Sequence, residues 1–148
     1  MVEKEGPIHK EVVKSRIADL LHVRLGSRIS QRLDNAILDA RIKKYINVNG
    51  DFLWPINMEH VNLRVYQGGD YKRSIEEIPP QEVSLAIFEC VKNSISISED
   101  DLIKETARLF GLKATANVSM KIQWIIRSMI TNTHLKQKAG KIMMGNLK

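Results

Sequence analysis

Apolar residues recur at helical spacing in two stretches of the chain that a shift of 89 residues superimposes. The shift places residues 8–54 over residues 97–143 without a gap, so that Ile8 meets Ile97 and Leu33 meets Ile122. Few residues are identical, but the apolar pattern is kept. Two helical stretches can also agree through their common period alone, so the duplication is a prediction about structure.

The first copy predicts two helices joined by a short turn. Residues 10–22 have apolar side chains at helical spacing, and Pro7 precedes them, as it often does near a helix start. We expect Gly26 to take the positive φ of a turn and Ser27 to cap a second helix over residues 28–43. The stripe that this helix would bury consists of Ile29, Leu33, Ala36, Ile37 and Ala40.

The spacing then changes from the helical period to the alternation of strands. Residues 45–48 and 51–54 are two short β-prone runs. Asn49-Gly50 between them is a strong hairpin signal, because both residues tolerate the positive φ of a type I′ turn, and Pro55 ends the second run. A helix–turn–helix followed by a hairpin is the layout of a winged helix.

The second copy has an additional helix, predicted over residues 80–92. Ser98 is expected to cap the next helix, Gly111 to turn the chain, and a last helix to run over residues 115–131. The first copy begins at its second helix. We therefore expect that its first helix lies upstream and that the chain is a fragment of a longer protein.

These patterns predict a mainly α fold with small β hairpins, an α+β class built from tandem winged-helix or helix–turn–helix-like units. The second hairpin is expected around Ala139-Gly140. The expected domains are residues 1–54, a connector over 55–78 with one strand in its alternating segment 61–66, and residues 79–148.

Composition limits the class of protein. The 148 residues, 43% hydrophobic and 27% charged, suffice for one ordinary domain or two very small ones, but not for a multidomain enzyme or a disordered chain. No apolar run could cross a bilayer, no signal peptide is evident, and the lone Cys90 has no disulfide partner within the chain. We therefore expect a cytoplasmic protein that does not bind membranes.

The net charge of +6 is concentrated in two basic blocks. Residues 1–54 carry +3 and residues 94–148 carry +5, whereas residues 55–93 between them carry −2. A basic surface favours polyanionic partners through counterion release, although it also keeps a protein soluble.

Four segments of the sequence resemble a known family. They are Glu5-Gly6-Pro7-Ile8-His9, Gly26-Ser27-Arg28-Ile29, Phe52-Leu53-Trp54 and Ile75-Glu76-Glu77-Ile78-Pro79-Pro80-Gln81-Glu82. Over most of residues 5–130 the chain is similar to a C-terminal domain of unknown function, which follows the ATPase and Vsr-like endonuclease segments of large bacterial superfamily I helicase-like proteins. The resemblance implies a nucleic-acid-processing context, with the helicase and nuclease domains of a parent protein as partners. It implies no catalytic residues.

The sequence contains no recognisable catalytic or metal site. A phosphate-binding G-x-x-x-x-G-K-[ST] motif is missing, and the four histidines lack metal-ligand spacing among themselves or with Cys90. No nucleophile and base stand together. We therefore predict a chain that is not an enzyme, has no metal or cofactor, and takes no small-molecule substrate.

The second helix of each copy is where a helix–turn–helix would contact DNA. At 100° per residue, Arg28, Arg32 and Asn35 fall on one side of the first such helix, away from the apolar stripe. Arginine can bind guanine or phosphate, and asparagine or glutamine can bind adenine. An ordinary solvated face has the same composition, and Asp39 favours that interpretation at the C-terminal end. The candidate nucleic-acid ligands are Arg28, Gln31, Arg32, Asn35, Lys43, Lys44, Lys121, Lys136, Lys138 and Lys141.

Two features leave alternatives open. Lysines along the hairpins suit phosphate contacts, but exposed hairpins also carry lysine to block edge pairing. Trp124 lies away from the apolar stripe and would either stack on a base or dock on a protein surface. The predicted function is a non-catalytic DNA-binding accessory module, for a duplex or a junction. The alternative is a protein-protein or interdomain docking module.

Overall fold

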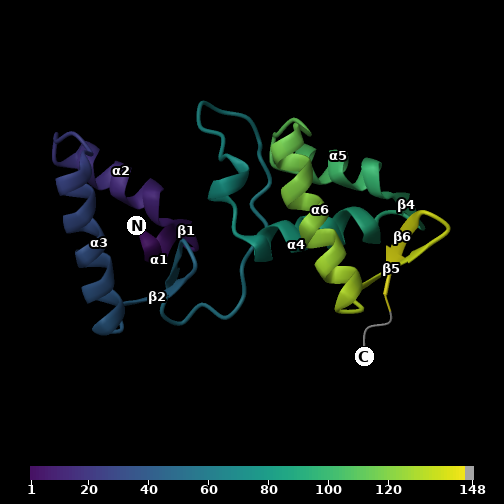
Figure 1. The fold of residues 1–148 in the computed structure, drawn as a ribbon, viewed down its shortest axis with the longest axis horizontal. Coiled ribbons are helices and arrows are strands. Elements are labelled where there is room, and N and C mark those ends of the chain that lie inside the picture. The colour runs from purple at the N-terminus through teal and green to yellow at the C-terminus, as the bar shows by residue number, and fades with distance from the viewer. Residues whose placement is uncertain (146–148) are drawn as a thin grey trace. The chain divides into compact units, whose positions relative to one another are not determined.

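The computed structural model describes residues 1–145, and the chain forms two compact units, Met1–Val61 and Asn62–Lys148. Each unit combines helices with a three-stranded antiparallel sheet, so the fold belongs to the mixed α+β class (Figure 1). Among the described residues, none of the helices has the length and apolar character that crossing a bilayer requires.

The first unit has three helices and one sheet. Its elements are α1 (Val2–Glu5), β1 (Ile8–His9), α2 (Lys10–Leu20), α3 (Ser27–Ile42), β2 (Ile46–Asn49) and β3 (Phe52–Pro55). The strands are ordered β1-β3-β2, so the hairpin of β2 and β3 lies beside the short strand that precedes α2.

The second unit has the same plan with a longer first helix. Its elements are the 3₁₀ turn η1 (Ile75–Glu77), α4 (Pro80–Lys92), β4 (Ile97–Ser98), α5 (Glu99–Leu109), α6 (Ala116–Thr131), β5 (Leu135–Lys138) and β6 (Lys141–Met144). Its strand order is β4-β6-β5.

The structure confirms the duplication of elements that the sequence predicts. A shift of 89 residues carries every element from β1 to β3 onto its counterpart from β4 to β6 with the same bounds. The strand register follows, because the pair Ile8 and Leu53 lies over the pair Ile97 and Ile142. Even the positive φ after the first helix of each pair is shared, at His22 and Gly111.

Two turn predictions for the first unit were wrong. Gly26 has φ −96° and is itself the N-cap of α3, whereas Ser27 is already helical and makes no capping bond. The positive φ falls instead at His22, where the Val23 amide donates back to the Ala18 carbonyl and closes α2.

The first hairpin is displaced by one residue from its predicted position. Asn49 pairs with Phe52 in the ladder, so the two-residue tip is Gly50-Asp51, with Gly50 at φ +58°. The second hairpin turns at Ala139-Gly140 as predicted, and both of its tip residues have positive φ. Strand pairing, rather than local turn preference, therefore sets the first tip.

The core of the second unit depends on α4, which packs against α5, α6 and β6. Ala86, Ile87 and Val91 of α4 are completely buried. Ser98 caps α5 as predicted, because its Oγ accepts from the Asp101 amide. Thr115, predicted as the first residue of the next helix, is instead its N-cap, and its Oγ1 accepts from the Val118 amide.

The strand predicted over residues 61–66 is not present, and residues 62–66 belong to the second unit without joining a sheet. The Arg64 amide donates to Glu82 Oε1, and the Tyr66 amide donates to the Leu109 carbonyl. The backbone bonds that a sheet partner would satisfy are thus made by a side chain and a helix end.

Glu82 of α4 anchors that segment through a buried ion network. Its carboxylate is fully buried and accepts hydrogen bonds from the Arg64 and Arg73 guanidinium groups, the shortest 2.7 Å long in each case. Burial alone would raise the pKa of Glu82, but the two arginines outweigh it and lower this pKa. The stabilisation is therefore complete above the ordinary glutamate pKa and is lost as the pH falls through the lowered value.

The first unit has a much smaller core of Ile8, Val13 and Leu53, with a lysine beside it. Lys14 is only 2% exposed, and its Nζ lies 3.0 Å from both Glu11 Oε1 and Asp34 Oδ1. Burial disfavours its charge, yet the two carboxylates raise the pKa of Lys14 overall. An ion pair thus joins α2 to α3 where the second unit has Ile103.

The predicted burial of the α3 stripe was wrong. No residue of α3 is buried: Ala36 is exposed, and Ile29, Leu33, Ile37 and Ala40 are only partly covered. The matching α6 residues Val118, Ile122, Ile125, Ile126 and Met129 are all buried. The difference arises because a full helix, α4, packs on α6, and the first unit has only the one-turn α1 at the corresponding place.

We predict that Glu82→Ala lowers the free energy of unfolding of the second unit by about 1–3 kcal/mol, because Arg64 and Arg73 lose their hydrogen-bonded carboxylate but remain partly accessible to water. Urea denaturation followed through amide signals of α4–α6 measures this change. The control is Glu89→Ala, an exposed acid on the same helix, which should change the free energy by no more than about 0.5 kcal/mol. Equal effects of the two variants would contradict the role of the network.

Candidate nucleic-acid interface

The first two turns of α3 present a polar surface. Arg28, Gln31, Arg32 and Asn35 are all exposed. None of the four side chains makes a hydrogen bond or an ion pair within the part of the chain that the structure describes. These donors are therefore available to an external ligand.

The second half of α3 differs from this polar surface. Leu38 and Ile42 are 50% and 69% exposed on the outer side of the helix. Lys43 makes an ion pair with Asp39 at 3.0 Å, whereas the exposed Lys44 makes none among residues 1–145. The candidate polar face thus ends near Asn35 and continues as an apolar one, which the sequence analysis did not predict.

The corresponding face of α6 is already occupied. Asn117 and Lys121, which match Arg28 and Arg32, both donate to Glu76 Oε1 at 2.8 Å. These hydrogen bonds, that from Lys121 above all, lower the pKa of Glu76 from 4.5 to about 2. Lys121, predicted as a nucleic-acid ligand, is therefore held by a carboxylate of its own unit.

Trp124 is 69% exposed on α6, on the side away from the core. Met120, four residues earlier and hence one turn away on the same side, is also 69% exposed. The two side chains form an exposed apolar pair, of which the sequence analysis noted only the tryptophan.

The three candidate lysines of the second hairpin are exposed. Lys136 and Lys138 lie on β5 and Lys141 begins β6, and none makes an ion pair with another described residue. Exposed ammonium groups of this kind suit contacts to phosphate, which position a protein without reading sequence.

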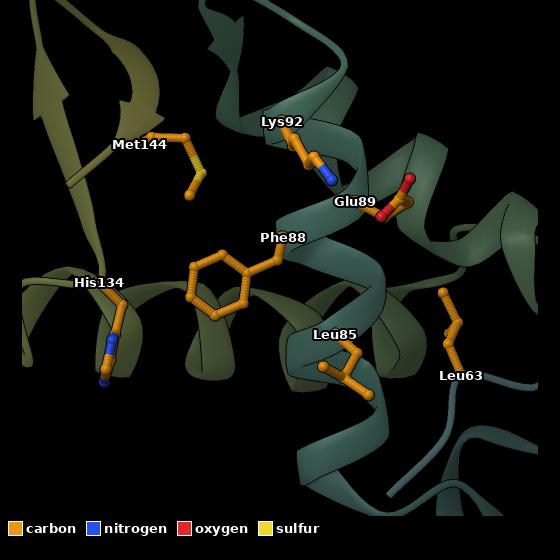
Figure 2. A pocket seen from close by; sticks show the side chains of 7 residues that line it. All are labelled: Leu63, Leu85, Phe88, Glu89, Lys92, His134 and Met144. Carbon is orange, nitrogen blue, oxygen red and sulfur yellow. The ribbon is translucent and has the colours of Figure 1, made fainter. Parts of the chain in front are cut away.

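An open hollow of about 570 Å³ lies on the outer side of α4. Figure 2 shows Phe88 directed toward His134 and Met144, with Leu63 on the opposite side of the helix; Leu85 also lines the hollow. The Phe88 and His134 rings meet edge to face at 6.0 Å. Glu89, Lys92 and His134 also line the hollow, but no ion pair or hydrogen bond joins these three among the described residues.

Metal-binding and nucleophilic side chains do not cluster within residues 1–145. Among the described residues no group of three or more His, Cys, Asp or Glu side chains could hold a metal ion. Cys90 is half-buried on α4, the Thr106 hydroxyl donates to its Sγ at 4.0 Å, and burial raises the pKa of its thiol. A raised pKa disfavours the thiolate that nucleophilic attack requires.

Comparison with family models, with curated proteins and with solved structures finds no match for this chain. The resemblance to the helicase-associated domain therefore stays a prediction.

The sequence analysis missed the two carboxylates that organise the second unit. Glu76 and Glu82 were part of an acidic connector and a helix start, with no role assigned. For Glu76 the sequence gives a partial indication, because the apolar residues Ile75 and Ile78 beside it suggest a segment that packs on the core. Both of these isoleucines are buried. No local pattern pairs Glu82 with Arg64 and Arg73, since these residues meet only through the tertiary fold.

We predict that Lys121→Ala raises the pKa of Glu76 from about 2 toward 4.5, because it removes the main hydrogen bond to the carboxylate. A pH titration of the Glu76 side-chain carboxyl signal by NMR measures the shift. Lys113→Ala, which removes an exposed charge with no ion pair to Glu76, is the control. An unchanged midpoint in Lys121→Ala would show that the ion pair does not form in solution.

Proposed function

We propose that the chain is a non-catalytic nucleic-acid-binding module of two winged-helix units and that it binds duplex DNA through the first unit. The order β1-α2-α3-β2-β3 and the strand order β1-β3-β2 support this assignment, since they provide a helix–turn–helix followed by a two-stranded wing. In such a unit the second helix, here α3, enters the major groove.

The observation that carries the proposal is the unpaired polar surface on the first turns of α3. In helix–turn–helix proteins the N-terminal residues of the recognition helix reach base edges. Arg28 and Arg32 suit guanine or phosphate, and Gln31 and Asn35 suit adenine. In the second unit the matching positions are engaged with Glu76, so α3 is the recognition helix of the proposal and α6 is not.

The lysines have a supporting role in this proposal. Lys44, Lys136, Lys138 and Lys141 would contact phosphates, which increases affinity and salt dependence without selecting a sequence. The module would act as an accessory to the helicase or nuclease domains of a bacterial parent protein, as the resemblance implies. No described group supports a catalytic role of its own.

A second candidate function is docking on a protein. It is favoured by the exposed apolar pairs Met120 with Trp124 on α6 and Leu38 with Ile42 on α3. Large exposed apolar side chains that cluster on one face are typical of interaction surfaces.

We predict that the double variant Arg28→Ala, Arg32→Ala weakens duplex binding and reduces the salt slope by about one unit per lost phosphate contact. Fluorescence anisotropy on a labelled duplex at several salt concentrations measures both quantities. Lys104→Ala with Lys113→Ala removes the same charge from exposed sites elsewhere and should change binding much less. Unchanged affinity at low salt in the arginine variant would remove α3 from the interface.

We predict that Trp124→Ala leaves the melting temperature of the second unit nearly unchanged, because a ring that is 69% exposed contributes little to the core. If Trp124 stacks on a base, single-strand affinity should fall by roughly 1–3 kcal/mol. If it docks on a protein, that affinity should not change. Thermal melts paired with a single-strand titration distinguish the two, and a large loss of stability would contradict the exposed position.

A further inference from the structure

The outer side of α3 carries one continuous stripe of side chains along most of the helix. This outer stripe consists of Gln31, Asn35, Leu38 and Ile42. At about 100° per residue, the four side chains leave the helix within about 60° of one another. All four are exposed, and Leu38 and Ile42 are 50% and 69% accessible to solvent. The same side of α3 is therefore amide in its N-terminal half and aliphatic in its C-terminal half.

The equivalent stripe of α6 is exposed as well, although α4 packs on that helix. The buried α6 residues, such as Ile122 and Ile126, lie on the other side. The shift of 89 residues places the outer stripe over Met120, Trp124, Arg127 and Thr131, which are all exposed. The exposure of the outer stripe therefore does not depend on what packs against the inner side of α3.

The two stripes carry different side chains at matching positions. Where α3 has the amides Gln31 and Asn35, α6 has Met120 and Trp124. Where α3 has Leu38, α6 has Arg127, whose Nε lies 3.6 Å from Glu99 Oε1. The order of amide and aliphatic groups on α3 is therefore not imposed by the shared fold, and it points to a ligand of the first unit.

Both halves of the outer stripe match the edge that an A·T base pair presents in the major groove. Adenine offers an acceptor and a donor side by side, which an asparagine or glutamine amide binds with its NH₂ and C=O groups together. Thymine adds a C5-methyl group, which aliphatic side chains contact. Guanine offers two acceptors and leaves an amide carbonyl without a partner, and cytosine has no methyl group. A G·C pair thus satisfies neither half.

The length of the outer stripe and the charges beside it suit a duplex. From Gln31 to Ile42 the helix rises by about 16 Å, which corresponds to about five base pairs at 3.4 Å each. Arg28 and Arg32 lie beside the amide half and can bind phosphates. Asp39 would repel phosphates, but its Oδ2 is 3.0 Å from Lys43 Nζ. The stripe therefore has no uncompensated acid beside its aliphatic half.

We propose that the outer stripe of α3 recognises a run of A·T base pairs, with Gln31 and Asn35 on adenine edges and Leu38 and Ile42 against thymine methyl groups. This inference rests on the proposed function, because it requires that α3 enters the major groove. It adds the class of sequence that the site selects. It also assigns Leu38 and Ile42 to the duplex rather than to a protein, because they continue the line of the two amides.

Four labelled duplexes of equal length and with identical ends test the inference with the full chain. Their central pairs are A·T, A·U, G·C or G·5-methylcytosine. Uracil removes the methyl group and keeps every hydrogen-bonding group, whereas 5-methylcytosine adds a methyl group to the G·C pair. Fluorescence anisotropy should show binding to A·T about threefold or more tighter than to A·U, and about tenfold or more tighter than to G·C. G·5-methylcytosine should bind more tightly than G·C.

These titrations distinguish failure of the inference from failure of the proposed function. Equal affinity for the A·T and G·C duplexes would overturn the inference and leave duplex binding intact. A preference for A·T without any difference between A·T and A·U would also overturn it, because the aliphatic half would then contact no methyl group. Absence of binding to all four duplexes at low salt would refute the proposed function and the inference together.

Variants of the chain assign the preference to the outer stripe. Leu38→Ala with Ile42→Ala should bring the ratio of A·T to A·U affinity close to one, while affinity for A·U changes little. Ile95→Ala is the matched control, since Ile95 is 98% exposed outside α3 and should keep the ratio. Gln31→Ala with Asn35→Ala should reduce the preference for A·U over G·C, which differ in base edges but both lack the methyl group. Thermal melts check that each variant is folded. An unchanged A·T to A·U ratio in the Leu38 and Ile42 variant would overturn the proposal.

Discussion

The buried carboxylate of Glu82 is the interaction on which the second unit depends. It lies at the start of α4 and is neutralised by Arg64 and Arg73, two residues of a segment without regular secondary structure. A buried carboxylate is costly unless it is paired and fully hydrogen-bonded, and here the pairing fixes both the segment and the helix. With α4 in place, α5 and α6 bury a continuous apolar stripe, and η1 places Glu76 against Lys121.

In the first unit the corresponding helix pair, α2 and α3, is less completely buried than α5 and α6. Its α3 buries none of its residues, and its α2 is joined to α3 partly through Lys14 and two carboxylates. The two units thus share topology and register but differ in how completely each hydrophobic surface is enclosed.

The polar and apolar surfaces of α3 have separate chemical uses. Its outer N-terminal turns present arginine, glutamine and asparagine, which suit nucleic acid, and its inner stripe presents aliphatic carbon, which suits packing within the unit. Arg28 and Arg32 lie at the border of the two.

The sequence by itself determined the local elements and their repetition, because helical spacing, strand alternation and capping residues such as Ser98 depend on near neighbours along the chain. It also identified the exposed position of Trp124 and the polar turns of α3. Only the tertiary structure decided what each surface faces. The tip at Gly50-Asp51 follows from strand register, and the absence of a strand at 61–66 follows from the bonds to Glu82 and α5. The partial burial of Leu33 and the exposure of Ala36, against the full burial of their counterparts Ile122 and Ile125, likewise follow from tertiary packing. A periodic pattern shows that one side of a helix can be buried, but burial requires a second surface, which lies elsewhere in the chain or in another molecule.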